Sequence, residues 1–582
     1  MIGLRKSAKY KKYDLEWLGT CLDEGWYIKK EKKGLFLCGS KSFGWGPLER
    51  VESYDAAGKK CIIFEAIAPG IICFDYAKVN NKKMLKELRE ISTRGKLVAS
   101  LGKLVSEELD KRNRAAYNNK KDKKTTGKAK EDNLELLLPW QIYIQWDSII
   151  QYLKKSRDLV VNASDDTKLA VFSKNFFVKP NDRPIRAKAQ KKNLTNWKSV
   201  IPDNFLDKDG PFSFMIDQVS TAKKLISELK LIEPGNYKTF TRLQVHTLMS
   251  IFFLGFFGRH QDKSSKLSRL STFKAGILAL GSIGKRQLVV ALTHYFNQYK
   301  NVSDFKEDDE NVMIRWLQLK PKGDPKEKPP GVENCVFDEP DWENSNQQLC
   351  DLQVDLEGGL EDVDGASKIC FADPYPGGTI LSSLIWTQEE VLMGIFPEVL
   401  MMLAIIPHID DTQAWCVSNL NRVNDYKGYT KSFRIKKEPS KDENLHEVIG
   451  IDATVCGINS KEKFLRECNK AYLGFSSSSN DVIATGHWGG GVFKGDKTVK
   501  ALVQLIAASQ ARKKLVYKAF RDADFKDGLD KTYKMLVDNK VTVKQLYKLV
   551  EEATGELKKA SKHKDPVLCG FALIQHLITK ML

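Results

Sequence analysis

The stretch KICFADPYPGGTILSSLIWTQEE, residues 368–390, decides the fold of the second half of the chain. It begins as a short apolar strand, turns at Gly377 and Gly378, and ends at the start of an apolar helix. Further strand-like and helical runs alternate from there to about residue 527, after which helices complete the chain. This alternation predicts an α/β sheet that is covered by helices on both faces.

A second run, ATGHWGGGVFKGD at residues 484–496, places a cluster of glycines between an expected strand and an expected helix. Backbone N–H groups in such a turn can bind an anion, because no side chains shield them. The run is not a nucleotide P-loop, since Asp496 stands where that motif has lysine and would repel a phosphate unless it caps the helix. A tight connection without a ligand is the alternative.

The triplet Gln388-Glu389-Glu390 has two interpretations. Thr387 and Glu390 have the spacing of a helix capping box directly before an apolar run. Adjacent carboxylates can also divide into an acid and a positioning group, which is how glycosidic bonds are cleaved near neutral pH. A helix N-terminus favours an ionised carboxylate, so burial or a bound anion would have to promote protonation of the acid.

The length of 582 residues predicts two to four domains. Thr241 and Gln244 have the spacing of a capping box at the start of an expected helix. Val245, Leu248, Met249 and Phe252 fall on one face of that helix and should lie in a core. The predicted divisions are a β-rich then helical N-terminal unit of unknown role (1–117), a basic linker (118–133), a mixed segment (134–196), a helical accessory subdomain with irregular connections (197–366), and the α/β domain (367–582).

The composition is that of a globular protein, with 42% hydrophobic residues, and the formal net charge is +19. This charge favours a polyanionic partner, including nucleic acid bound through the basic segments at residues 118–132 and 186–193. Eleven cysteines without a CxxC pair indicate reduced thiols in an intracellular protein, nuclear or cytoplasmic. We expect no metal, no signal peptide and no membrane partner.

Both glycine-containing runs occur in the order and approximate separation that poly(ADP-ribose) glycohydrolases show in their catalytic domain. FTRLQVHTLMSIFFLGFF resembles that family's helical accessory region, and YKGYTKSF, IDAT, ECNKAYLGF and LVYKAF follow in the family's order. The resemblance extends from about Trp197 to near the C-terminus. It implies a macrodomain-like three-layer α/β/α sandwich with a mixed sheet, preceded by an α-helical accessory subdomain and the small β-rich N-terminal unit.

The resemblance also assigns roles to individual residues. Glu390 would be the general acid that protonates the leaving ribose oxygen and then activates water, and Glu389 would hold the hydroxyls of that ribose. The implied ligand is poly(ADP-ribose) or an ADP-ribosylated protein, and no cofactor is implied. The implied substrate-binding residues are Gln388 at the sugar, Gly489, Gly490, Gly491 and Phe493 at the diphosphate, Tyr429 and Phe520 at the adenine, and Gly377, Gly378, Asp373 and His487 nearby.

The chain departs from the family's pattern at several positions. Thr379 replaces the third glycine of the catalytic loop, and the segment to Gln388 is one residue longer. Cys370 and Asp373 stand where the family has Asp and Asn, and His487 stands where it has Asn. Cys370 is expected to be a buried strand thiol. Two alternatives to an active hydrolase therefore stay open: a pseudoenzyme that binds ADP-ribose, and a basic structural or nucleic-acid-binding protein with a vestigial macrodomain.

Overall fold

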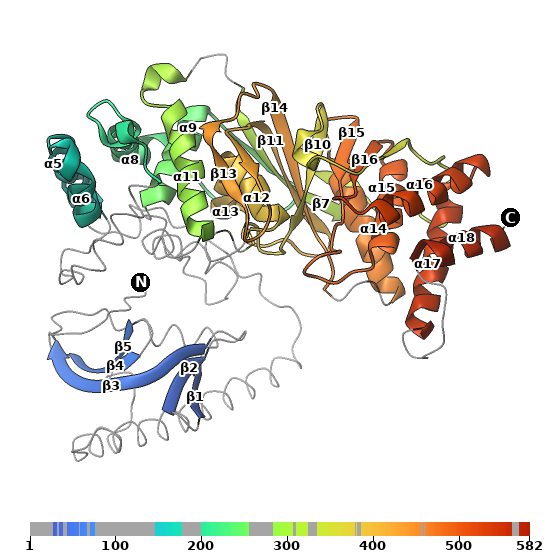
Figure 1. Ribbon diagram of the computed structural model, residues 1–582, viewed down its shortest axis with the longest axis horizontal. Coiled ribbons are helices and arrows are strands. Elements are labelled where there is room, and N and C mark those ends of the chain that lie inside the picture. The colour runs from blue at the N-terminus through green and yellow to red at the C-terminus, as the bar shows by residue number, and fades with distance from the viewer. Residues whose placement is uncertain are drawn as a thin grey trace. The chain divides into compact units, whose positions relative to one another are not determined.

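The structure is a computed structural model, and the chain divides into two compact units (Figure 1). The smaller unit comprises residues 1–134 with 261–265, and the larger unit comprises residues 135–260 with 266–582. The residues that the structure describes are 27–31, 34–38, 44–56, 59–66, 70–75, 146–176, 200–227, 229–254, 283–305, 310–323, 334–378, 380, 386–455, 458, 460–560 and 570–581.

The smaller unit contains a five-stranded antiparallel sheet in which each strand pairs with the next one in the chain. This confirms the small β-rich N-terminal unit. The helical pattern expected at residues 82–116 and the basic segments at 118–132 and 186–193 lie outside the described residues. The strands are β1 (Tyr27–Glu31), β2 (Gly34–Cys38), β3 (Gly44–Ala56), β4 (Lys59–Ala66) and β5 (Gly70–Asp75).

A mixed nine-stranded sheet is the centre of the larger unit, in the order β6-β7-β11-β14-β10-β15-β16-β9, with β8 paired to β7. Strands β14, β10, β15, β16 and β9 are parallel, whereas β6, β7, β11 and β14 pair antiparallel. The bounds are β6 (Tyr237–Phe240), β7 (Val312–Lys320), β8 (Val336–Asp338), β9 (Leu352–Asp355), β10 (Ala366–Ala372), β11 (Gln413–Asn421), β14 (Leu445–Asp452), β15 (Val482–Thr485) and β16 (Lys514–Lys518).

Helices cover both faces of this sheet, because successive strand side chains point alternately into two hydrophobic cores. On β10, Cys370 belongs to the first core and Ile369 to the second. The three-layer α/β/α sandwich is therefore confirmed (Figure 1). The first core contains α5 (Trp146–Val161), α6 (Asp165–Phe176), α8 (Pro211–Leu225), α9 (Arg242–Leu254), α11 (Ile283–Gln298), α12 (Gln388–Ile395) and α13 (Met402–Ile405); the second contains α14 (Lys461–Ser476), α15 (Lys497–Gln510), α16 (Ala523–Asp538), α17 (Val543–Ala560) and α18 (Gly570–Met581).

Helix α9 carries the predicted apolar stripe, and its four members are buried. The capping box before it is present, since Gln244 N donates to Thr241 Oγ1 at 3.2 Å and Thr241 N donates to Gln244 Oε1 at 3.0 Å. The interval 197–366 differs from its expected helical character, because β6, β7, β8 and β9 lie in it and join the sheet. Their partners are distant in the chain, so no local pattern reveals the pairing.

The run at residues 429–437 also differs from the expected strand of the α/β series. Its second half forms β13 (Arg434–Pro439), which pairs with β12 (Asn424–Lys427) in a separate two-stranded sheet. Tyr429 lies in the connection between these two strands and is thereby released from the sheet. Within the described residues, no helix combines the length and the apolar character that a membrane crossing requires.

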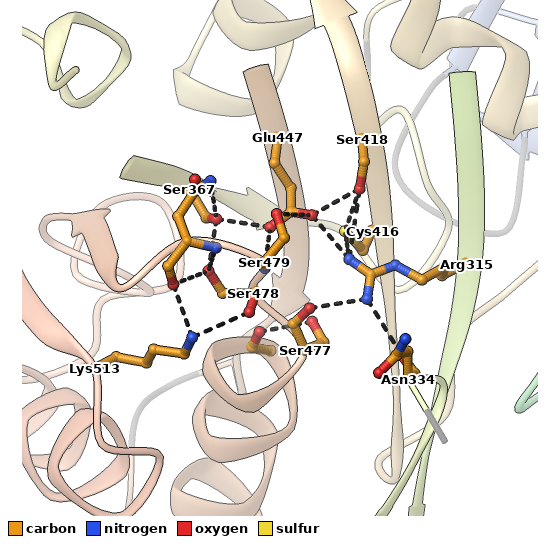
Figure 2. Close-up of polar contacts among 12 residues, drawn as sticks. Arg315, Asn334, Ser367, Cys416, Ser418, Glu447, Ser477, Ser478, Ser479 and Lys513 are labelled. Atoms are coloured by element: carbon orange, nitrogen blue, oxygen red, sulfur yellow. Dashed lines mark hydrogen bonds and ion pairs between the residues drawn. The ribbon is translucent and has the colours of Figure 1, made fainter. Parts of the chain in front are cut away.

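A buried ion pair joins the strands at the end of the sheet where β14 and β10 begin (Figure 2). Arg315 on β7 lies 2.8 Å from Glu447 on β14. The Glu447 carboxylate also accepts hydrogen bonds from the hydroxyls of Ser367, Ser418 and Ser479, from 2.6 to 3.1 Å long. Because these partners come from β10, β11 and the segment after α14, one carboxylate connects elements that are far apart in sequence.

Candidate active site

Three adjacent parallel strands bring the candidate residues to the end of the sheet that lies opposite the Arg315–Glu447 ion pair. In the order β10-β15-β16, the loops that follow these strands leave the sheet side by side, because the carboxyl ends of parallel strands share an edge. The Phe371 ring on β10 lies 3.6 Å from the point where a Cβ on Gly486 would stand. The turn at Gly377, the glycine turn (residues 486–495) and Phe520 follow β10, β15 and β16 respectively.

Glu389 is buried beneath the loop that follows β10. Its Oε2 accepts a hydrogen bond from Asp373 N at 3.1 Å, and its Oε1 accepts one from Gly377 N at 3.0 Å. Burial, followed by the nearby Glu390 and Asp373 carboxylates, raises the pKa of Glu389 well above its usual range, although the two backbone N–H groups oppose this shift. The loop backbone therefore fixes the position of this carboxylate.

Glu390 is the third residue of α12 and is also buried. Its Oε2 accepts hydrogen bonds from Thr387 N at 2.8 Å and from Thr387 Oγ1 at 2.6 Å, so the predicted capping box is present. Its Oε1 lies 3.1 Å from the point where a Cβ on Gly378 would stand, and Glu389 Oε2 lies 2.3 Å from the same point. Glu390 thus caps the helix and still lies beside Glu389 at the glycine loop.

Glycine is required at both positions of the loop turn. The φ angles of Gly377 and Gly378 are +94° and +49°, a region that residues with a side chain rarely adopt. A Cβ on Gly377 would stand 2.3 Å from Leu403 Cδ2, while one on Gly378 would collide with Glu389. Thr379 and residues 381–385 lie outside the described residues.

Gln388 connects the start of α12 to the backbone of β10 near the end of that strand. Its Oε1 accepts a hydrogen bond from Phe371 N at 2.7 Å, and its Nε2 donates to Ile369 O at 2.9 Å. Cys370, between these two strand residues, is buried as expected. Burial, with Glu389 and Glu390 next, raises the pKa of its thiol well above the usual range. The side chain is therefore a neutral thiol packed against the carboxylate pair.

The glycine turn is closed by its own backbone. Gly495 N donates to Gly489 O at 2.9 Å, and Gly489 has a φ of +69°. A Cβ on Gly491 would meet nothing within 4 Å, so this residue faces open space. Asp496 is the N-cap of α15 and accepts a hydrogen bond from Val499 N at 3.0 Å. Because that carboxylate is engaged with the helix, its presence is compatible with an anion at the turn.

His487 hydrogen-bonds inside the protein through both ring nitrogens. Nδ1 lies 3.0 Å from the Tyr517 hydroxyl and Nε2 lies 3.0 Å from Ala519 O. Burial, followed by the charge of Lys497, lowers the pKa of this imidazole. A neutral ring that donates from Nε2 and accepts at Nδ1 satisfies both contacts, so His487 supports the start of the glycine turn.

Tyr429 and Phe520 form an aromatic pair, with ring centroids 5.0 Å apart and planes at 62°. Phe520 is 60% exposed and has a φ of +53°, so the backbone holds an apolar ring toward solvent at a conformational cost. Burial raises the pKa of Tyr429, and the Glu390 carboxylate is the next cause. The ring of Phe520 is therefore available to a ligand, with Tyr429 packed beside it.

The side chains beneath the glycine turn were not anticipated from the sequence. Trp488 is fully buried and donates from Nε1 to Ile451 O at 3.1 Å. Gln504 on α15 donates to Gly486 O at 3.1 Å, and Lys500, one helical turn before it, lies against Trp488 and Gly489. Polar residues four apart on the otherwise apolar face of this helix were the available signal. The described residues contain no group of three His, Cys, Asp or Glu side chains that could hold a metal ion.

This α/β/α sandwich, with a mixed sheet and loops that contain glycine after adjacent parallel strands, agrees with the macrodomain fold that the comparisons with known proteins indicate. Residues 339–527 match the family model described as poly(ADP-ribose) glycohydrolase, macro domain fold. The chain accordingly resembles poly(ADP-ribose) glycohydrolases over this region, which contains the carboxylate pair, the glycine turn and the aromatic pair.

Curated relatives carry the same description. The chain is 27% identical over 267 residues to a probable poly(ADP-ribose) glycohydrolase 2 of Arabidopsis thaliana, covering 37% of this chain and 51% of the relative. It is 27% identical over 297 residues to poly(ADP-ribose) glycohydrolase 1 of the same plant, covering 37% and 54%. For poly(ADP-ribose) glycohydrolase 2 of Caenorhabditis elegans the identity is 25% over 241 residues, covering 37% and 50%. The chain spans about half the length of these relatives.

Proposed function

We propose that this protein is a poly(ADP-ribose) glycohydrolase that cleaves the ribose–ribose glycosidic bonds of poly(ADP-ribose) and releases ADP-ribose. The observation that carries the proposal is the convergence of two buried carboxylates, Glu389 and Glu390, on Gly378. The glycine turn follows the neighbouring strand, where backbone N–H groups suit a diphosphate. The names of the relatives support this substrate.

In the proposed mechanism the two glutamates have different roles. Glu389, held by two backbone N–H groups, accepts hydrogen bonds from the ribose hydroxyls and orients the sugar. Glu390, which lies beside Glu389 at Gly378, protonates the leaving ribose oxygen as the glycosidic bond breaks, and its carboxylate then takes a proton from the water that attacks the anomeric carbon. Gln388 sets the position of both residues by anchoring the helix to β10.

The remaining residues bind the ADP part of the ligand. The N–H groups of Gly489, Gly490 and Gly491 would contact the diphosphate, with Phe493 beside it, and the exposed ring of Phe520 would stack on the adenine with Tyr429. The bound diphosphate also favours a protonated carboxyl group nearby and stabilises an oxocarbenium-like transition state. Direct ligand contacts of Asp373 and His487 belong to the same proposal.

The test compares wild-type protein with Glu390→Gln and Glu389→Gln on purified poly(ADP-ribose), with ADP-ribose release measured by chromatography. Glu390→Gln keeps an oxygen that can accept from Thr387 N, so the helix cap survives while the acid is lost. We expect its release rate to fall at least about 100-fold, with affinity for ADP-ribose retained. Glu443→Gln, at an exposed glutamate, is the matched control and should retain full activity. Unchanged hydrolysis by Glu390→Gln would refute the assignment.

A second candidate is a protein that binds ADP-ribose without cleaving the polymer. It is favoured by the capping box, because two hydrogen bonds from Thr387 give Glu390 a structural role that needs no chemistry. If this candidate is correct, calorimetry will show that the protein binds ADP-ribose. Neither the wild-type protein nor the variants will then release ADP-ribose from the polymer.

The net charge of +19 favours contact with further polyanions, and a nuclear or cytoplasmic role in the response to DNA damage is part of the same proposal. If nucleic acid were the main ligand, its binding would weaken steeply with salt and would survive substitution of Gly489. Such a result, together with no affinity for ADP-ribose, would favour the nucleic-acid-binding alternative.

A further inference from the structure

Lys500 is a fully buried lysine directly beneath the glycine turn. Its Nζ lies 3.5 Å from the centre of the Trp488 ring, and its Cε lies 2.8 Å from the point where a Cβ on Gly489 would stand. The residue is only 1% exposed. Burial of an ammonium group costs free energy unless the group is paired. A leucine of similar size would fill this place without that cost, so the presence of a lysine needs an explanation.

Lys500 belongs to a cluster of charges between β14 and α14. It forms an ion pair with the buried Glu467, which Arg466 also contacts at 2.8 Å. Arg466 and Lys470 in turn pair with Asp452, Lys470 at 2.8 Å. Three cations thus share two carboxylates inside the protein, and Arg466 reaches one exposed carboxylate outside the cluster. Burial, followed by the charge of Arg466, lowers the pKa of Lys500 well below its usual value, and Asp452 opposes this shift. The support that Lys500 gives the glycine turn therefore comes from its contacts with Trp488 and Gly489.

The contacts of Lys500 are with the part of the turn that the ligand is proposed to use. Trp488 immediately precedes the three consecutive glycines, and its ring is held between the Lys500 ammonium and a hydrogen bond to Ile451. Gly489 needs its φ of +69° to direct the following amides, and a Cβ there would collide with Lys500. The lysine therefore supports the turn at the residue where its direction changes.

We propose that Lys500 is a positioning residue of the glycine turn. Its cation–π contact with Trp488 and its packing against Gly489 hold the backbone N–H groups of residues 489–491 in the orientation that binds an anion. The inference rests on the proposed function, because it assumes that a diphosphate binds there. The lysine acts through the turn and touches neither reacting atom.

The experiment uses the full-length chain and compares Lys500→Met with Lys470→Met. Both variants remove one buried lysine from the same cluster, but Lys500 contacts Trp488 and Gly489 directly, whereas Lys470 lies on α14 and pairs with Asp452. Affinity for ADP-ribose is measured by calorimetry, turnover of poly(ADP-ribose) by release of ADP-ribose, and stability by thermal unfolding. We expect Lys500→Met to weaken ADP-ribose binding about tenfold, the size of a desolvated cation–π contact, and to raise KM more than it lowers kcat.

The double variant Lys500→Met/Glu467→Gln separates positioning from stability, because it also neutralises the carboxylate that keeps Arg466 but loses Lys500 in the single variant. We expect it to regain thermal stability while its affinity for ADP-ribose stays about tenfold low. The inference is overturned if the double variant binds like wild type, or if Lys470→Met weakens binding as much as Lys500→Met does. Failure of the wild-type chain to bind ADP-ribose would instead overturn the proposed function, and this inference with it.

Discussion

Replacement of Gly378 by alanine should damage catalysis much more than folding. The new Cβ would stand 2.3 Å from Glu389 Oε2, whereas real Cβ contacts are not shorter than 3.0 Å, so the carboxylate must move by about 0.7 Å (3.0 minus 2.3). That shift also strains the hydrogen bond from Asp373 N. Since a displacement of about 1 Å can reduce a rate about 100-fold, we expect a loss between about ten- and 100-fold in ADP-ribose release.

The backbone cost of the same change must be measured separately, because alanine at a φ of +49° is unfavourable by about 1–2 kcal/mol. Gly365→Ala is the matched control: its φ is +60°, but a Cβ there would meet nothing within 4 Å. Both variants should lose similar unfolding free energy in urea, and only Gly378→Ala should lose turnover. Equal turnover in the two variants would refute the placement of the carboxylates against Gly378.

Two further outcomes test other parts of the structure. Glu447→Gln should reduce the free energy of unfolding by about 3–5 kcal/mol. Burial alone would raise the pKa of Glu447, but Arg315 and the hydroxyl hydrogen bonds hold this pKa below its usual 4.5. The stability that the ionised carboxylate contributes is therefore present above pH 4.5 and is lost as the pH falls through the lower pKa of the folded state. An equally stable variant in urea titrations at pH 7 would contradict this. Phe520→Gly removes an exposed ring and an unfavourable φ together, so thermal stability should hold or rise while ADP-ribose binding weakens about tenfold; undiminished affinity by calorimetry would remove Phe520 from the site.

The sequence predicted those elements whose signals are local. The capping boxes at Thr241 and Thr387 and most strands and helices from β10 onward follow from spacing and periodicity within a few residues, whereas the separate sheet of β12 and β13 does not. The macrodomain fold followed from the order of several motifs.

Features that depend on distant partners could not be predicted in this way. Arg315 on β7 gives no sign that Glu447 lies beside it, because 132 residues separate the two. Strand β9 is four residues long, and its partner β16 begins far along the chain. The packing of Lys500 against Trp488 and Gly489 likewise depends on how the glycine turn folds over helix α15.

Glu390 both caps helix α12 and is the proposed general acid, and this affects how activity can be inferred in related chains. A descendant that had lost hydrolysis would still benefit from glutamate at this position, because helix α12 begins with its bonds to Thr387. Gly378 is constrained differently: its φ of +49° disfavours most side chains, and a Cβ there would collide with Glu389 rather than with a helix cap. If the proposed hydrolysis is correct, Glu389 and Gly378 retained together are therefore a more discriminating marker of activity than Glu390 alone, which the helix start also needs.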